Sequence, residues 1–165
     1  MDVGNEFELV ETFLPLQIIF IRIGLAALLG GMIGFERQRH SSGAGFRTHI
    51  LISVAAALFT ILAFEIYHTI DDGTGSPADP IRAVEAVTAG IAFLGAGAIF
   101  RHGSGIQGLT TGAGMWLAGA IGVAAALGYY IIAAAVSIFV VVVLALLRRI
   151  SHRFIGEEEN NAPGD

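Results

Sequence analysis

Five long apolar runs divide this chain, and short polar segments separate them. The runs cover residues 14–35, 48–67, 81–100, 109–127 and 129–147, and each is rich in Leu, Ile, Val, Ala, Phe and Gly. A helix of about 20 apolar residues crosses a hydrocarbon core of roughly 30 Å. The pattern therefore predicts an all-α membrane protein whose five transmembrane helices form one domain over residues 1–150. Within it, residues 90–116 are expected to be two helices joined by a short basic turn.

The arginines indicate how these helices are oriented. Short loops rich in Lys and Arg tend to stay in the cytoplasm. All nine basic residues are arginines, and most lie between the first and second runs, between the third and fourth, and after the fifth: Arg37, Arg39, Arg47, Arg101, Arg148, Arg149 and Arg153. The prediction is an outside N-terminus and a cytoplasmic C-terminus. Residues 151–165, which end in GEEENNAPGD, are expected to form a short cytoplasmic disordered tail.

A weak internal repeat relates the two halves of the chain. Residues 39–61 placed over residues 101–123, an offset of 62, give six identities in 23 positions, including RHSSG over RHGSG. Helices 1 and 2 would then correspond to helices 3 and 4, both pairs entering from the same side, as a parallel repeat about an axis along the membrane normal. The fifth helix would stand outside this repeat and face lipid.

Composition narrows the class of protein further. The chain is 55% hydrophobic and 14% charged, with a mean hydropathy of +0.73, far from the roughly 25% charged residues of soluble domains. Cysteine is absent, so no disulfide or metal thiolate is expected, and the five histidines have no metal-ligand spacing. We expect no bound metal, no cofactor and no nucleic-acid partner. The acidic N-terminus, without a basic residue before Arg22, is unlike a cleaved signal peptide, so the first helix is expected to be retained.

The cytoplasmic loops are the first candidate site. The second and fourth helices begin there, so their positive N-terminal ends and capping threonines would lie beside arginines, which favours an anion. The ligand would be a lipid phosphate, a soluble phosphate compound or a carboxylate of a partner protein. The alternative is that the arginines only set topology and touch headgroups generically. The candidate residues for anion or partner binding are Arg37, Arg39, Arg47, Thr48, Arg101, Thr110 and Thr111.

Two ionisable residues lie within the predicted spans. Under the offset of 62, Arg22 falls on Val84, next to Glu85, so the two side chains are expected at similar depth as an intramembrane ion pair. Such a pair would be functional or would simply lock the first helix to the third; Arg22 could also snorkel to the interface. The outer acidic residues, which could hold Mg²⁺ weakly or be simply solvated, are Glu65, Asp71, Asp72, Asp79 and Glu85.

Small residues at i, i+4 spacing predict close helix packing. Membrane helices associate where Gly and Ala let backbones approach. Such pairs are Gly30 with Gly34, Ala86 with Gly90, Ala92 with Ala96, and Gly108 with Gly112. The glycines assigned to packing are Gly30, Gly34, Gly90, Gly95, Gly97, Gly108 and Gly112. These faces serve the monomer or a homo-oligomer, of which a dimer is favoured.

Four segments together resemble the MgtC/SapB family of bacterial inner-membrane proteins. They read GGMIGFERQR, GFRTH, DPIRAVEAVTAGIAFLGAGAIFR and GLTTGAGMWLAGAIG. The resemblance implies a five-span domain of a multi-pass plasma-membrane protein. It also implies a role in magnesium or phosphate homeostasis, by regulation of a membrane partner or by transport.

No loop places a nucleophile beside a base, so the protein is expected to be non-enzymatic. The favoured reading is a regulator that binds a partner or anionic headgroups at its cytoplasmic face. The alternative is an oligomeric transporter or channel for Mg²⁺ or another ion.

Overall fold

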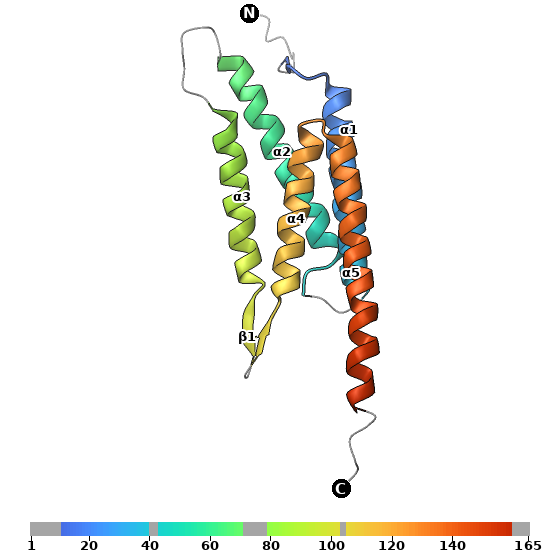
Figure 1. Ribbon diagram of the computed structural model, residues 1–165. Helices are drawn as coiled ribbons and strands as arrows, with labels where there is room; N and C mark the ends of the chain where they lie inside the picture. Colours follow the sequence, from blue (N-terminus) through green and yellow to red (C-terminus); the bar gives the residue numbers. More distant parts are fainter. Residues whose placement is uncertain (1–10, 40–42, 71–78, 103–104, 160–165) are drawn as a thin grey trace, which may run out of the picture.

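The fold is a bundle of helices that run alternately in opposite directions (Figure 1). The computed structural model describes residues 11–39, 43–70, 79–102 and 105–159. Within these ranges the helices are α1 (Leu16–Gln38), α2 (Phe46–Ile70), α3 (Pro80–Gly97), α4 (Leu109–Ala126) and α5 (Tyr130–Glu159). Two short strands, β1 (Phe100–His102) and β2 (Gly105–Gln107), join α3 to α4. The predicted all-helical architecture is confirmed, with most helix ends within three residues of their expected positions.

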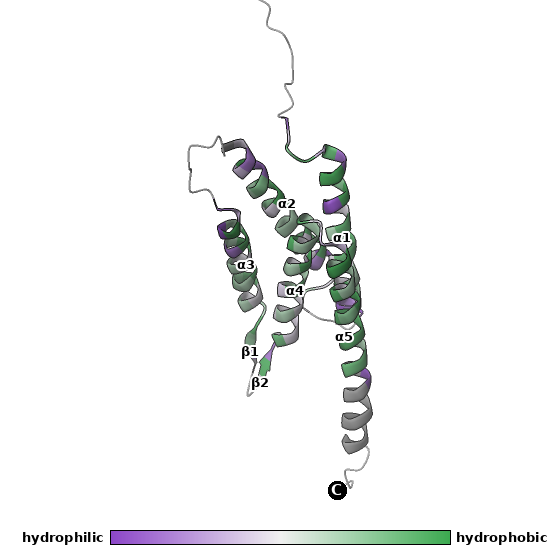
Figure 2. Cartoon of the chain, turned by 45° about the horizontal axis from the view of Figure 1, so that its top comes forward, coloured by the Kyte–Doolittle hydropathy of each residue, from purple (hydrophilic) through white to green (hydrophobic). Residues whose placement is uncertain are grey.

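Four of the helices are long and apolar enough to cross a membrane. These candidate spans are Leu16–Gln38, Phe46–Thr69, Leu109–Ala126 and Tyr130–Leu147. Figure 2 shows hydrophobic residues along most of the length of the helices, and Ile131 and Phe93 are 85% and 79% exposed. The chain is therefore a multi-pass membrane protein. Helix α3 lies alongside α2 and α4 but carries Arg82 and Glu85 near its start, and its crossing of the membrane stays a prediction.

Helix α2 is central to the packing. It packs most extensively against α1 and α4, while α3 rests on α2 and α4, and α5 rests on α1 and α4. The buried interior between α2, α3 and α4 includes Ile52, Ala56, Ile91, Met115 and Ala118. Its small side chains let the helices lie close together, as is usual where lipid gives no hydrophobic driving force for association.

Four of the predicted packing glycines are at close helix contacts. A Cβ added at Gly30 would lie 2.6 Å from Ser53 Cβ, and one at Gly34 would lie 2.8 Å from Phe46 Cα. Gly112 faces Gly95 across the α3–α4 contact, where an added Cβ would lie 2.9 Å from the Gly95 carbonyl oxygen. These close approaches hold α1 against α2 and α3 against α4.

The other three glycines do something else. Around Gly90 and Gly97, no other described atom lies within 4 Å of an added Cβ. These two glycines therefore do not pack against another helix of the same chain, contrary to the prediction for a monomer. Both residues are exposed, and no neighbouring helix touches them. Gly108 precedes α4 with φ +86°, and an added Cβ would collide with the Ala98 carbonyl oxygen. It is a turn glycine, because a left-handed φ and this close approach both exclude a side chain.

The connection between α3 and α4 is a β-hairpin, which the apolar pattern did not predict. Helix α3 ends at Gly97, three residues before its expected end, and Phe100 then pairs with Gln107 in antiparallel register. Arg101 pairs with Ile106 in the same ladder. A three-residue strand is too short to show an alternating pattern, so the segment looked like a helix end followed by a loop.

At the C-terminal end, α5 continues to Glu159. The part of the expected disordered tail from residue 151 to residue 159 is therefore helical, because the helix of the fifth span carries on past its apolar part. The rest of that tail, residues 160–165, lies outside the described residues. So do Asp71 and Asp72 of the outer acidic set. The parallel repeat stays a prediction, and the hairpin has no counterpart in the described residues between α1 and α2.

Candidate functional site at the arginine end

The arginines of the α1–α2 and α3–α4 connections gather at one end of the bundle. We call this the arginine end: it comprises the end of α1, the start of α2, the hairpin and the start of α4 (Figure 1). Arg37, Arg39, Arg47 and Arg101 all belong to it. The gathering follows from the alternating helix directions, which bring the α1–α2 and α3–α4 connections to the same end.

Arg37 is the arginine that is built into the bundle. Its Nη2 donates a hydrogen bond of 3.0 Å to Oγ1 of Thr111, which is 5% exposed in the first turn of α4. The Nε–H of Arg37 is buried and has no hydrogen-bond partner among the described residues. A buried donor without a partner costs free energy, roughly 1–3 kcal/mol. The bond therefore connects the end of α1 to the start of α4.

The other three arginines are exposed. The Arg39 guanidinium lies 4.7 Å from the centre of the Phe35 ring, a cation–π contact. Arg47 and Arg101 are exposed in the first turn of α2 and in β1. No acidic side chain of the described part of the chain forms a salt bridge with either of them. Their charge is therefore available to a molecule that approaches this end.

The threonines do not cap the helices as expected. Helix α2 begins at Phe46, so Thr48 lies within its first turn and is only half-buried. Gly108, not a threonine, precedes α4; Thr110 is exposed and Thr111 accepts the bond from Arg37. The capping prediction is wrong because both helices start two or three residues earlier than the threonines would require. Their place in an anion site stays a prediction.

Sequence reasoning missed a buried polar row on α2. His49 and Ser53 are both 0% exposed, and His49 Nδ1 lies 2.8 Å from the Gly45 carbonyl oxygen. Since a carbonyl only accepts, Nδ1 carries the proton of this bond. His49 Nε2 and Ser53 Oγ have no partner among the described residues. A Cβ added at Gly114, one turn beyond Thr111, would lie 3.1 Å from Nε2, so the ring lies close to α4 beside the Arg37–Thr111 contact.

The signal for this row was present in the sequence. His49, Ser53 and Thr60 are spaced at i, i+4 and i+11, which places them on one face of a helix. Thr60 is also 0% exposed and donates to the Ala56 carbonyl oxygen at 2.7 Å. Polar side chains in a membrane interior usually mark function. The row extends from the arginine end into the middle of α2.

Arg22 lies at the opposite end and does not pair with Glu85. Its Nη1 donates to the Ala126 carbonyl oxygen at 2.5 Å, and its Nε donates to Tyr130 Oη at 3.2 Å. The last carbonyls of a helix lack intrahelical partners and attract cations. Glu85 is exposed on α3, which packs on α2 and α4 rather than on α1. The predicted ion pair is therefore wrong, and Arg22 instead holds the α4–α5 turn against α1.

At the same opposite end, Glu65 fixes the chain before α1. Its carboxylate accepts from the backbone N–H groups of Phe13 and Leu14 at 2.7 and 3.0 Å. The Phe13 ring also stacks on His68, with 3.7 Å between ring centres. Glu65 therefore holds the segment before α1 in place. No group of three or more metal-ligating side chains occurs in the described ranges. Weak Mg²⁺ binding by the outer acidic residues stays untested.

Comparison with known proteins agrees with the motifs of the sequence. Residues 23–153 match the MgtC family. The chain belongs to the MgtC family. It is 42% identical over 123 residues to a protein of Brucella abortus called "Protein MgtC", covering 74% of this chain and 48% of that relative. The protein of the same name in Salmonella typhimurium is 38% identical over 128 residues, covering 78% of this chain and 52% of the relative.

A third relative carries a functional name. The Escherichia coli protein called "Putative magnesium transporter YhiD" is 36% identical over 137 residues, covering 83% of this chain and 64% of the relative. This MgtC-family chain therefore spans about half to two thirds of the length of these relatives. No solved structure matches it.

Proposed function

We propose that this protein is a non-enzymatic membrane protein of magnesium homeostasis, and that it acts by binding an anionic ligand or an acidic partner at its arginine end. The arginine end faces the cytoplasm in this proposal, and the membrane is the bacterial inner membrane. Membership of the MgtC family and the names of the relatives support the magnesium role.

The gathering of four arginines at one end is the observation that carries the proposal. Short connections rich in arginine favour the cytoplasmic side. Exposed guanidinium groups attract phosphates and carboxylates through charge-assisted hydrogen bonds. The opposite end carries Arg22 and Arg82 together with Glu65, Asp79 and Glu85, so it lacks the excess of arginine found at the arginine end.

Arg37 gives this end a connection to the interior. Its bond to Thr111 joins α1 to α4. One turn further along α4, Gly114 lies close to the buried His49 of α2. An anion that approaches Arg39, Arg47 or Arg101 also changes the field at Arg37. Binding at the surface would in this way reach the helix packing.

Complementation of growth in low magnesium tests the proposal. A bacterium that lacks its own MgtC-family gene would carry this chain with Arg39→Glu, Arg47→Glu or Arg101→Glu. We expect each reversal to abolish growth while the protein still inserts. Arg82→Glu is the matched control, because Arg82 is exposed at the opposite end of α3. Full growth with all three reversals would contradict the proposal.

A Mg²⁺ transporter or channel is the second candidate, because the Escherichia coli relative is named as a putative transporter. Five helices are few to enclose a pore within one chain, so transport would require an oligomer. Purified protein in liposomes distinguishes the two functions. Mg²⁺ flux that persists in the charge-reversed variants would show that the protein is a transporter and not a regulator. Absence of flux would support the binding function.

A further inference from the structure

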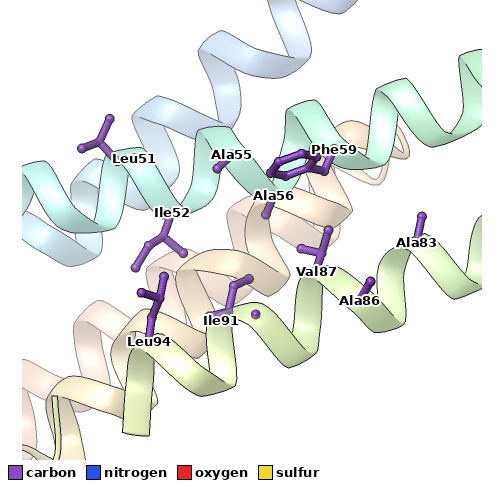
Figure 3. Close-up of a pocket in the computed structure, with 11 residues that line it drawn as sticks. Leu51, Ile52, Ala55, Ala56, Phe59, Ala83, Ala86, Val87, Ile91 and Leu94 are labelled. Carbon is purple, nitrogen blue, oxygen red and sulfur yellow. The ribbon is translucent and has the colours of Figure 1, made fainter. Parts of the chain in front are cut away.

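An apolar groove lies between α2 and α3, on the outer side of the bundle. Its volume is about 610 Å³, within the roughly 300–1,000 Å³ of pockets that hold small ligands. Figure 3 shows its walls: Leu51 to Phe59 on α2, and Ala83 to Leu94 on α3. The lining side chains are all hydrocarbon, and the backbone at Gly90 completes the α3 wall. A polar ligand would find no hydrogen-bond partner among these side chains.

The groove has the depth of a single membrane leaflet. Leu51 to Phe59 spans about 12 Å and Ala83 to Leu94 about 16 Å, at 1.5 Å per residue. Half of a hydrocarbon core of roughly 30 Å is about 15 Å. On α2 the groove occupies the half next to the arginine end, since Leu51 is only five residues from the helix start; on α3 it extends from Ala83, near the start of that helix, to Leu94. Its length and position thus suit one acyl chain of the leaflet on that side.

A cation stands at the end of the groove where a headgroup would lie. Arg47 precedes Leu51 by four residues, so the two side chains share one face of α2. Arg47 is exposed and no acidic side chain in the described ranges pairs with it. One helical turn, about 5.4 Å, separates their positions along the axis. A guanidinium above an apolar groove matches the two halves of an anionic phospholipid.

We propose that the α2–α3 groove binds an anionic phospholipid, with one acyl chain along Gly90 and the headgroup phosphate at Arg47. This inference deepens the proposed function, because it names the chemical class of a ligand at the arginine end. The lipid fills the space that α3 leaves beside α2. It also explains why Gly90 lies exposed although α3 approaches α4 closely at Gly95.

Gly90 supplies the sharpest test. A Cβ there would meet no other described atom within 4 Å, so Gly90→Leu has room to place its side chain in the groove. Gly24→Leu is the matched control, because Gly24 is equally open and lies on α1, away from the groove. Ala55→Phe, from the exposed α2 wall, is a second filling variant should Gly90→Leu fail to insert.

The measurement is native mass spectrometry of the purified full chain with phosphatidylglycerol or phosphatidylcholine of identical acyl chains. We expect preferential retention of phosphatidylglycerol. Because each buried methylene contributes about fourfold to affinity, a filled groove lowers retention about tenfold or more. Gly24→Leu retains lipid like the unaltered chain. Arg47→Gln removes the preference for phosphatidylglycerol, while Arg149→Gln, the same charge change on α5, preserves it.

Three outcomes would overturn the inference. Gly90→Leu and Ala55→Phe variants that insert and retain lipid like the unaltered chain place the lipid elsewhere. An unchanged headgroup preference in Arg47→Gln removes the role of Arg47. A disulfide between two copies of a Gly90→Cys variant in membranes makes a second copy the occupant; the chain has no other cysteine, so the assay has no background.

Lipid retention and growth are read separately. If the unaltered chain retains lipid as expected but the charge-reversed variants grow fully, the groove is a lipid site and the proposed function is wrong. If the charge-reversed variants fail to grow but the unaltered chain retains no lipid, the proposed function stands and the groove is not a lipid site.

Discussion

Two glycines of α1 should respond in opposite directions to the same substitution. A Cβ at Gly34 would lie 2.8 Å from Phe46 Cα, 2.9 Å from His49 Cβ and 3.0 Å from the Gly45 carbonyl oxygen. Carbon atoms prefer separations of about 3.5–4.0 Å, so α1 and α2 would have to move apart. The three neighbours are backbone atoms or a Cβ, which cannot rotate away.

The magnitude follows from two opposing effects. Overpacking of this kind costs about 1–3 kcal/mol, and replacing a helical glycine by alanine returns about 0.5–1 kcal/mol. Gly34→Ala should therefore lower the free energy of unfolding by about 1 kcal/mol, between limits of about 0 and 2.5 kcal/mol. At Gly24 no other described atom lies within 4 Å, so Gly24→Ala keeps only the gain in helix propensity, about 0.5–1 kcal/mol.

Equilibrium unfolding in mixed micelles, followed by helical circular dichroism, measures both variants against the unaltered protein. The two substitutions add the same methyl group to the same helix, so the difference between them isolates the contact with α2. Equal stability of Gly34→Ala and Gly24→Ala would show that α1 and α2 are not in the close contact described above.

Two further predictions concern side-chain hydrogen bonds. Thr111→Val keeps the shape but removes the acceptor of Arg37, so it should lower the free energy of unfolding by about 1.5–3 kcal/mol. Thr110→Val, at an exposed neighbour, should change it by less than about 0.5 kcal/mol, and equal losses would contradict the role of the bond. Glu65→Gln weakens two backbone contacts of the segment before α1. Proteolysis near residue 13 should become faster in that variant while cleavage after α5 is unchanged; an unchanged rate near residue 13 would show that the carboxylate does not hold the segment.

The helices could be predicted from the sequence because each is marked by its own composition. The apolar runs are separated by polar connections, and the positions of the arginines indicate which connections lie at the same end of the bundle. Both signals are local. Gly30, Gly34, Gly95 and Gly112 were also predicted as contact residues, since closely spaced small residues on a membrane helix usually face a neighbour.

The partner of each helix face could not be predicted in the same way. Arg22 and Glu85 were paired by depth alone, but α4 and α5, not α3, lie beside that part of α1. Gly90 looks like Gly34 in sequence, yet no helix of the bundle covers it. His49 was passed over because a single histidine without ligand spacing carries no motif, although its burial at the arginine end makes it part of the candidate site.

The uneven distribution of close contacts also determines which helix has freedom to move. Helix α2 is held on both sides at glycines, by α1 at Gly30 and Gly34 and by α4 at Gly122, where an added Cβ would collide with the Ser53 carbonyl oxygen. Helix α3 meets the bundle closely near Gly95 and is separated from α2 by the groove along much of its length. A hinge motion of α3 about its hairpin end would change the width of the groove while the other four helices kept their packing. Amide exchange in a bilayer should accordingly be faster in the first turns of α3 than in the matching turns of α2.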